Sequence, residues 1–197
     1  MIVNIRGTHG SGKSTVVKSI MALADTIIEV PNLHKPKKPL GYFVTMRGGR
    51  SLYVVGSYET ACGGCDAIQP YADIWPRVEN AAERGWDVLF EGALVSSSYG
   101  EIGRSSEKFG EDFVFAFLNT PLDVCLARIV QRRAAKGNFE PLNPTNTEVK
   151  FHNVLRSRPK IENEFGRRCV TLDYTKPVKQ VLGLFGIAIT REPNWGA

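Results

Sequence analysis

The sequence predicts an α/β fold in which helices cover both faces of a doubly wound, mostly parallel sheet. Apolar runs typical of buried strands alternate along the chain with segments whose apolar residues recur at helical spacing. A glycine-rich loop separates the first predicted strand from the first predicted helix. The length of 197 residues suffices for one domain with a sizeable core, so we expect a single domain over residues 1–197.

The glycine-rich loop reads Gly-Thr-His-Gly-Ser-Gly-Lys-Ser-Thr over residues 7–15 and fits the phosphate-binding pattern G-x-x-x-x-G-K-[ST]. Backbone N–H groups of such a loop and the following helix N-terminus favour an anion. We therefore expect a nucleoside triphosphate here, with Lys13 reaching its β- and γ-phosphates and the Ser14 hydroxyl on Mg²⁺. The candidate nucleotide-binding residues are Thr8, His9, Gly10, Ser11, Gly12, Lys13, Ser14 and Thr15.

The remaining regular elements follow from apolar runs and their spacing. Strands are predicted at residues 2–5, 25–30, 88–90, 113–118 and 170–172, and helices at residues 13–23, 70–84, 121–136 and 177–185.

Some segments depart from the simple alternation of strand and helix. Residues 42–45 and 52–55, joined by a Gly-Gly turn, predict an inserted β-hairpin. Residues 96–112 fit either a loop or an irregular helix. Thr147 is predicted to cap a polar helix that Pro159 breaks or kinks.

The net charge of +5 is unevenly distributed. Residues 128–168 hold ten Lys and Arg against four Asp and Glu, and residues 35–50 hold five basic residues and no acid. Such zones suit nucleotides or a nucleic-acid backbone, although a solvated basic face is the alternative. The sequence has no apolar run of membrane-spanning length and no signal peptide, so we expect a cytoplasmic protein without a membrane partner.

Residues of about 35–75 are the candidate acceptor-binding insertion, because loops of this kind often carry specificity. Six aromatic residues within it would stack on a nucleobase or simply join the core. Its pair Cys62 and Cys65 lacks the second pair that a zinc site needs, and we expect reduced thiols.

Two acids are candidates for the chemistry. Glu91 directly follows an apolar strand, where open α/β sheets bind their ligands. It would act on Mg²⁺ through water or accept the proton of the attacking hydroxyl. Asp66 lies in the glycine loop of the insertion, where it would either deprotonate an acceptor or cap the next turn.

With its elements in this order, the chain resembles the P-loop nucleoside and nucleotide kinases. Besides the loop at 7–15, the likeness rests on the strand that ends in Glu91 and on the turn Asp173-Tyr-Thr-Lys-Pro. It implies ATP and Mg²⁺ as cofactors and places residues 175–178 beside the adenine. Gly92 follows Glu91 where many nucleotide kinases carry an Asp-Arg pair, which is a departure from a plain thymidylate kinase.

The same resemblance implies a lid over about residues 128–150. Its arginines would be Arg128, Arg132 and Arg133, spaced i, i+4 and i+5 on one helix. In that role they would stabilise charge on the transferring phosphoryl group. The alternative is that these arginines form a solvated helix face.

A narrower likeness comes from Gly56-Ser-Tyr, Cys62-Gly-Gly-Cys-Asp and Phe90-Glu-Gly. These segments are similar to those of bacteriophage kinases that phosphorylate 5-hydroxymethyluracil in DNA during thymidine hypermodification. The likeness implies a hydroxymethyl acceptor in DNA and a host-cytoplasmic location. The alternatives are a free nucleoside or nucleotide acceptor, a polynucleotide 5′-kinase, and a regulatory module that binds a nucleotide without catalysis.

Overall fold

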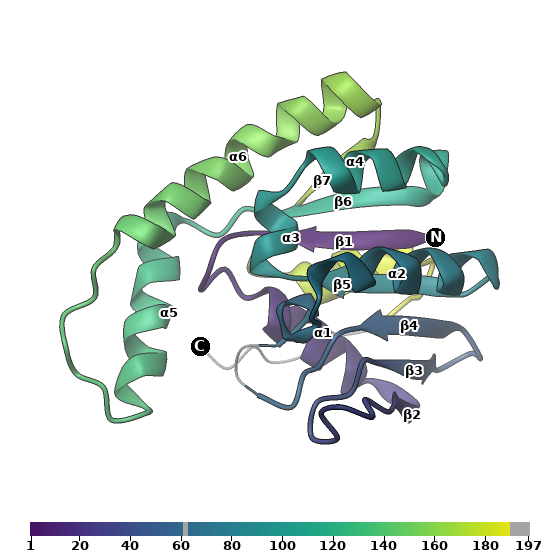
Figure 1. Cartoon of the computed structure of the whole chain (residues 1–197), viewed down its shortest axis with the longest axis horizontal. Coiled ribbons are helices and arrows are strands. Elements are labelled where there is room, and N and C mark those ends of the chain that lie inside the picture. Colours follow the sequence, from purple (N-terminus) through teal and green to yellow (C-terminus); the bar gives the residue numbers. More distant parts are fainter. Residues whose placement is uncertain (61–62, 190–197) are drawn as a thin grey trace.

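The computed structural model describes residues 1–60 and 63–189. A seven-stranded sheet in the order β2-β3-β4-β5-β1-β6-β7 runs through the molecule (Figure 1). Its strands are β1 (Ile2–Arg6), β2 (Ala24–Val30), β3 (Gly41–Met46), β4 (Ser51–Val55), β5 (Asp87–Glu91), β6 (Phe113–Leu118) and β7 (Arg168–Leu172). The helices are α1 (Lys13–Met21), α2 (Ile74–Glu83), α3 (Ala93–Ser97), α4 (Gly100–Glu107), α5 (Leu122–Ala134), α6 (Thr145–Phe165) and α7 (Pro177–Leu184).

The prediction of an α/β fold with a mostly parallel sheet is confirmed. β1 pairs in parallel with β5 and β6, while β4 and β7 extend the parallel part on either side. The predicted hairpin is β3 and β4, and it forms part of this same sheet. β2 adds an antiparallel edge strand next to β3.

Two apolar cores lie on the two faces of the sheet, because alternate residues of each strand point in opposite directions. Val3 and Ile5 of β1 face the core that α1 and α7 cover. Ile2 of β1 and the phenylalanines of β6 face the second core, to which α2, α4 and α6 contribute. In Figure 1, α2, α3 and α4 lie in front of the sheet, on the side of this second core.

The carboxyl edge of the parallel strands gathers the loops that matter for function. The loop after β1, residues 92–99 after β5 and residues 119–121 after β6 all emerge there. Because β2 and β4 run in the same direction as β5, the chain also leaves the sheet at that edge after Val30 and after Val55. The helices α5 and α6 form an arm that projects beyond the same edge (Figure 1).

The structure corrects two helix predictions and resolves a third. α6 begins at Thr145, so Thr147 does not cap it; Asn143 Oδ1 instead accepts a hydrogen bond from Thr145 N. α6 also continues through Pro159 without a break, because Pro159 lies on the exposed face, where water can bond the carbonyl that loses its partner. Residues 96–112 contain the end of α3 and all of α4.

Two further findings concern the cysteine pair and the apolar character of the helices. Cys65 is a buried free thiol, whereas Cys62 lies outside the described residues, so the expectation for the pair stays a prediction. Within the described ranges, no helix combines the length and the apolar character that crossing a bilayer would take.

Candidate active site

The loop 7–15 connects β1 to α1 and curls around an open space at the carboxyl edge. Gly10 and Gly12 adopt φ values of 76° and 100°, which side chains other than glycine rarely adopt. A Cβ at Gly10 would also overlap the carbonyl of Cys125, so the first turn of α5 packs directly on the loop. Glycine at this position is therefore required by both the backbone conformation and the close approach of α5.

Lys13 begins α1 and is only 7% exposed. Its Nζ donates to the carbonyl oxygens of Gly7 and Thr8 at 2.9 and 3.0 Å, so its ammonium lies inside the loop. Burial lowers the pKa of Lys13, and the negative charges of Glu91 and Asp66 oppose this shift. The loop therefore holds a positive charge at its centre, where a phosphate would bind.

Glu91 ends β5 next to the loop and is 1% exposed. Ser14 Oγ donates to Glu91 Oε1 at 2.8 Å. Burial raises the pKa of Glu91 to about 7, although the charge of Lys13 and the bond from Ser14 favour the ionised form. The two residues predicted to manage a metal are thus in contact, and both offer oxygen ligands.

Asp66 also lies at the cleft, but the structure shows it capping a helix. Its Oδ2 and Oδ1 accept hydrogen bonds from the backbone N–H groups of Ala93 and Leu94, at 2.8 and 3.2 Å. Asp66 therefore caps the distant helix α3, and not the next turn of its own loop as the local alternative predicted. Its exposed carboxylate also lines the cleft, so the role as a base stays a prediction.

The loop that carries Asp66 is fixed against Glu91. Gly64 has φ of 86°, and a Cβ at this position would overlap the Glu91 carboxyl group. The segment that carries Asp66 therefore packs directly against Glu91, which fixes the two acidic residues relative to each other.

Two of the three predicted lid arginines line the cleft. Arg128 Nη1 donates to Ser11 O at 3.3 Å, and its guanidinium lies 5.9 Å from the Tyr174 ring centroid. Arg132 lines the cleft with Arg128. Arg133 instead donates to Asn138 Oδ1 at 3.1 Å, in the turn that follows α5, and does not line the cleft within the described residues.

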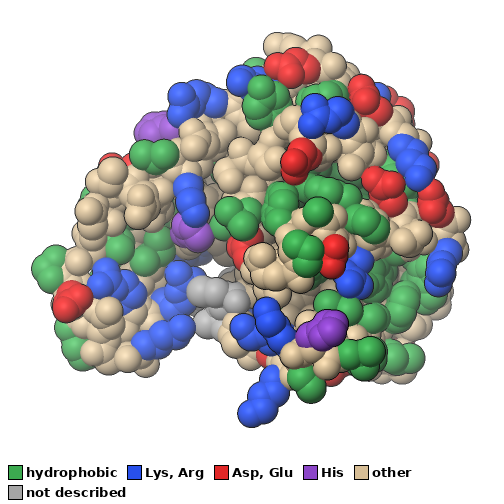
Figure 2. All heavy atoms as spheres, in the orientation of Figure 1, with side chains coloured by type: hydrophobic (Ala, Val, Ile, Leu, Met, Phe, Trp, Pro, Cys, Tyr) green, Lys and Arg blue, Asp and Glu red, His purple; other side chains and the backbone are tan. Residues whose placement is uncertain are grey.

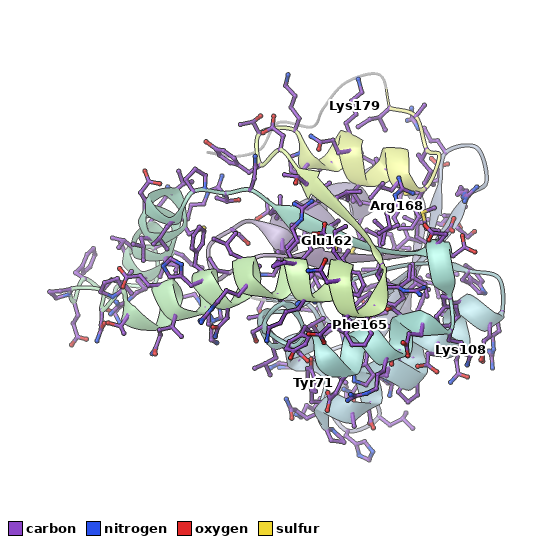
Figure 3. All side chains as sticks on the ribbon, turned by 90° about the horizontal axis from the view of Figure 1, so that it is seen from above. Tyr71, Lys108, Glu162, Phe165, Arg168 and Lys179 are labelled. Atoms are coloured by element: carbon purple, nitrogen blue, oxygen red, sulfur yellow. The ribbon has the colours of Figure 1, made fainter. Side chains whose placement is uncertain are left out.

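Sequence reasoning missed several contacts because they join distant segments. Thr8 Oγ1 donates to Thr147 O at 3.2 Å, and Lys150 Nζ lies 2.9 Å from His9 Nε2, so α6 rests on the loop. Tyr174 and Pro177 line the cleft on its other side, within the turn expected to border the adenine. Figure 3 shows α6 extending from the arm to Phe165, beside the sheet.

Arg6, the last residue of β1, is fully buried and had no predicted role. Its Nη2 donates to the carbonyls of Ser96 and Ser98 and to Ser157 Oγ. Burial lowers the pKa of Arg6 to about 9. This single side chain ties the segment after β5 and the middle of α6 to the base of the loop.

The cleft enclosed by these elements has a volume of about 390 Å³. It is lined by the P-loop, by Asp66 and Glu91, and by Arg128 and Arg132 of α5. A parallel α/β sheet with such a loop after its central strand belongs to the P-loop class of α/β proteins.

Comparison with known proteins narrows this class. The chain is 40% identical over 166 residues to the 5-hmdU DNA kinase of Pseudomonas phage PaMx11, covering 82% of this chain and 85% of that protein. It is 32% identical over 167 residues to the 5-hmdU DNA kinase of Pseudomonas phage M6, with coverage of 80% and 83%. The chain belongs to the family of 5-hmdU DNA kinases, and the protein is a kinase.

The chain was also compared with protein-family models and with solved structures. No protein-family model matches the sequence. A solved gluconokinase from Sinorhizobium meliloti 1021 aligns with a TM-score of 0.46 at 14% identity, over 93% of this chain and 90% of that one.

Glu91→Gln is expected to stabilise the ligand-free protein at pH 8 by up to about 3 kcal/mol, and by little at pH 5. The folded protein keeps the Glu91 proton up to about pH 7, whereas the unfolded chain releases it near the ordinary value of 4.5. Between these values the folded state binds more protons, so wild-type stability falls as pH rises. Urea unfolding between pH 5 and 8 measures the difference.

The exposed Glu140→Gln is the matched control for this prediction and should show no such trend. A Glu91→Gln effect that is equal at pH 5 and pH 8 would contradict the assignment of a proton to buried Glu91.

Proposed function

We propose that the protein transfers the γ-phosphate of ATP, with Mg²⁺, to the hydroxymethyl group of 5-hydroxymethyluracil in DNA. The observation that carries the proposal is 40% identity, over 82% of the chain, to a protein named 5-hmdU DNA kinase. The geometry of the cleft supports it, because a phosphate-binding loop and an exposed carboxylate line the same space.

The donor side of the cleft fits a triphosphate with its metal. Loop amides and Lys13 offer positive charge to the phosphates. Ser14 Oγ and the Glu91 carboxyl group, 2.8 Å apart, offer the oxygen ligands that Mg²⁺ prefers, directly or through water. When bound there, Mg²⁺ would supply neutralisation of charge on the β- and γ-oxygens. Tyr174, held by Arg128, and Pro177 would border the adenine.

We assign to Asp66 the role of the base that takes the proton from the acceptor hydroxyl. Glu91 is engaged with Ser14 on the metal side, whereas Asp66 is exposed and retains lone pairs beyond its two backbone bonds. As the acceptor oxygen bonds to the γ-phosphorus, its proton passes to Asp66 and ADP leaves with the electrons of the broken β–γ bridge. Arg128 and Arg132 line this space and would stabilise the charge on the transferred group.

DNA would bind along the carboxyl edge. Lys35, Lys37 and Lys38 are exposed in the segment between β2 and β3. Figure 2 shows Lys and Arg side chains on both sides of a hollow between the α5–α6 arm and the body of the protein. A base inside a duplex would have to leave the stack to reach the loop, at a cost on the order of a few kcal/mol.

Half of the six aromatic residues expected to stack on that base are buried, and Phe43 is half-buried but packs on Tyr53 and Trp86. Tyr42, Tyr53 and Tyr58 are buried in the core. Tyr71 and Trp75 are half-buried and line a shallow cavity beside α4, so they are the better candidates for base stacking.

A labelled-phosphate assay tests the proposed acceptor. With γ-labelled ATP, label is expected to enter DNA that contains 5-hydroxymethyluracil, and not unmodified DNA or the free nucleoside and nucleotide. Lys13→Ala should reduce this transfer by about 10²–10³-fold or more, because the charge that positions the triphosphate is lost. Label found only in the free nucleotide, or at 5′ ends of unmodified DNA, would refute the proposal in favour of the corresponding kinase.

The salt dependence of the reaction tests the DNA surface. Removing the charges of Lys37 and Lys38 together should make the slope of log(kcat/KM) for DNA against log salt shallower by about 1.5, since each phosphate contact contributes roughly 0.7–0.9. The matched control removes Arg84 and Lys108, which follow α2 and α4 at the opposite edge of the sheet. Equal slopes for the two double variants would place the DNA elsewhere.

A further inference from the structure

The first turns of α6 contact the P-loop through one main-chain carbonyl and one side chain. Thr8 Oγ1 donates to Thr147 O at 3.2 Å, and Lys150 Nζ lies 2.9 Å from His9 Nε2. His9 and Lys150 are 141 positions apart in the sequence, and their contact is partly buried. Lys150 has no role in the site described so far.

His9 occupies a central place among the charges of the cleft. Burial lowers its pKa most, and Lys150, Lys13 and Arg132 lower it further, while Asp66 opposes the shift. The imidazole is therefore neutral near pH 7, so its Nε2 can accept a hydrogen bond from the Lys150 ammonium. Since Nε2 is the acceptor, the ring proton lies on Nδ1.

The cleft of the ligand-free protein holds excess positive charge. Its lining includes Lys13, Lys18, Arg128 and Arg132 against the two acids Asp66 and Glu91. Lys150 does not itself line the cleft within the described residues, but it contacts His9, which does. A neutral imidazole is a weaker partner for an ammonium group than a phosphate oxygen, because hydrogen bonds between charged groups are roughly twice as strong. Lys150 is thus held beside the loop by a partner that a phosphate would displace.

We propose that Lys150 is a catalytic residue that binds the transferring γ-phosphoryl group, and that His9 is its positioning residue. The inference rests on the proposed role of the loop as the triphosphate site. His9 is the second residue after Gly7, within the loop that cradles the phosphates. The flexible four-carbon stem of lysine allows Nζ to leave His9 and reach the γ-oxygens while α6 stays in place.

The ammonium keeps its protons throughout the proposed reaction. Lys150 donates hydrogen bonds to the γ-oxygens while the bond to the β-phosphate breaks and the bond to the acceptor oxygen forms. It also compensates charge on the side of the group that faces α6, whereas Arg128 approaches from α5. Through Lys150, α6 contributes a positive charge and hydrogen-bond donors to the γ-phosphoryl group.

Measuring nucleotide affinity distinguishes a Lys150 contact with the γ-phosphate from a Lys150 contact with DNA. The affinities of Lys150→Met for ADP and for a non-hydrolysable ATP analogue, both with Mg²⁺, are compared with those of the wild type. We expect unchanged ADP affinity, a roughly tenfold loss of preference for the ATP analogue, and a kcat about 10²-fold lower. Lys150→Arg, which keeps the charge and the reach, should recover most of the preference.

Arg156→Ala is the matched control, since Arg156 lies on the same helix and bonds Asn153 Oδ1 and the carbonyl of His152. It should leave nucleotide preference unchanged. Lys150→Gln serves as the second variant if Lys150→Met unfolds, because glutamine still offers His9 a donor. Unchanged preference in a folded variant, or a raised KM for DNA alone, would overturn the proposal; the latter would make Lys150 a DNA-phosphate contact.

The two proposals fail in different ways. If the wild type binds neither nucleotide, the triphosphate site itself is wrong. If it prefers the ATP analogue and the Lys150 variants keep that preference, only the role of Lys150 is wrong.

A double-variant cycle tests His9. His9→Leu removes the acceptor for Lys150, and its effect on kcat should largely disappear in the Lys150→Met background. Additive effects of the two substitutions would show that His9 does not act through Lys150.

Discussion

The site depends on the burial of two opposite charges at the carboxyl edge of the sheet. Lys13 is held by the carbonyls of its own loop, and the Glu91 carboxyl group is held by Ser14. Within the described residues, no direct ion pair joins Lys13 to Glu91. Burial consequently lowers the pKa of Lys13 and raises that of Glu91. A polyanion beside Lys13 would offset the free-energy cost of burying its ammonium charge. A divalent cation beside Glu91 would likewise offset the cost of burying its carboxylate charge.

The rest of the molecule keeps this pair in place. Arg6 joins the base of the loop to the segment after β5 and to α6. Gly64 lets the acceptor-side segment pack against Glu91, while Asp66 holds the start of α3. The P-loop, Glu91 and Asp66 are therefore fixed relative to one another, which is the preorganisation that the proposed phosphoryl transfer would require.

The sequence predicted the parts of this account that are local. The P-loop has a fixed spacing, the strand before Glu91 is an uninterrupted apolar run, and the prolines and glycines mark the turns. The continuity of α6 was missed because the sequence does not show that Pro159 lies on the exposed face of the helix, where water can bond the carbonyl that loses its partner. Asp66 was left between two roles because the backbone groups that it caps lie more than 25 positions away.

The contacts of Arg6, His9 and Lys150 are beyond sequence reasoning for a related reason. A buried arginine at a strand end has no sequence signature, since its acceptors are backbone carbonyls of other segments. Similarly, the regular spacing of Arg128, Arg132 and Arg133 gave no sign that Arg133 would bond Asn138 instead of lining the cleft.

The most direct test of the central claim is the number of protons exchanged when Mg²⁺ and ATP bind together. At pH 7, about half of the ligand-free molecules carry a proton on Glu91, whose pKa is about 7, and a cation bound at that carboxyl group must displace it. Titration calorimetry in buffers of different ionisation enthalpy measures this exchange. The wild type should release more protons per site than Glu91→Gln. Equal proton exchange by the two proteins would contradict the placement of the metal at Ser14 and Glu91.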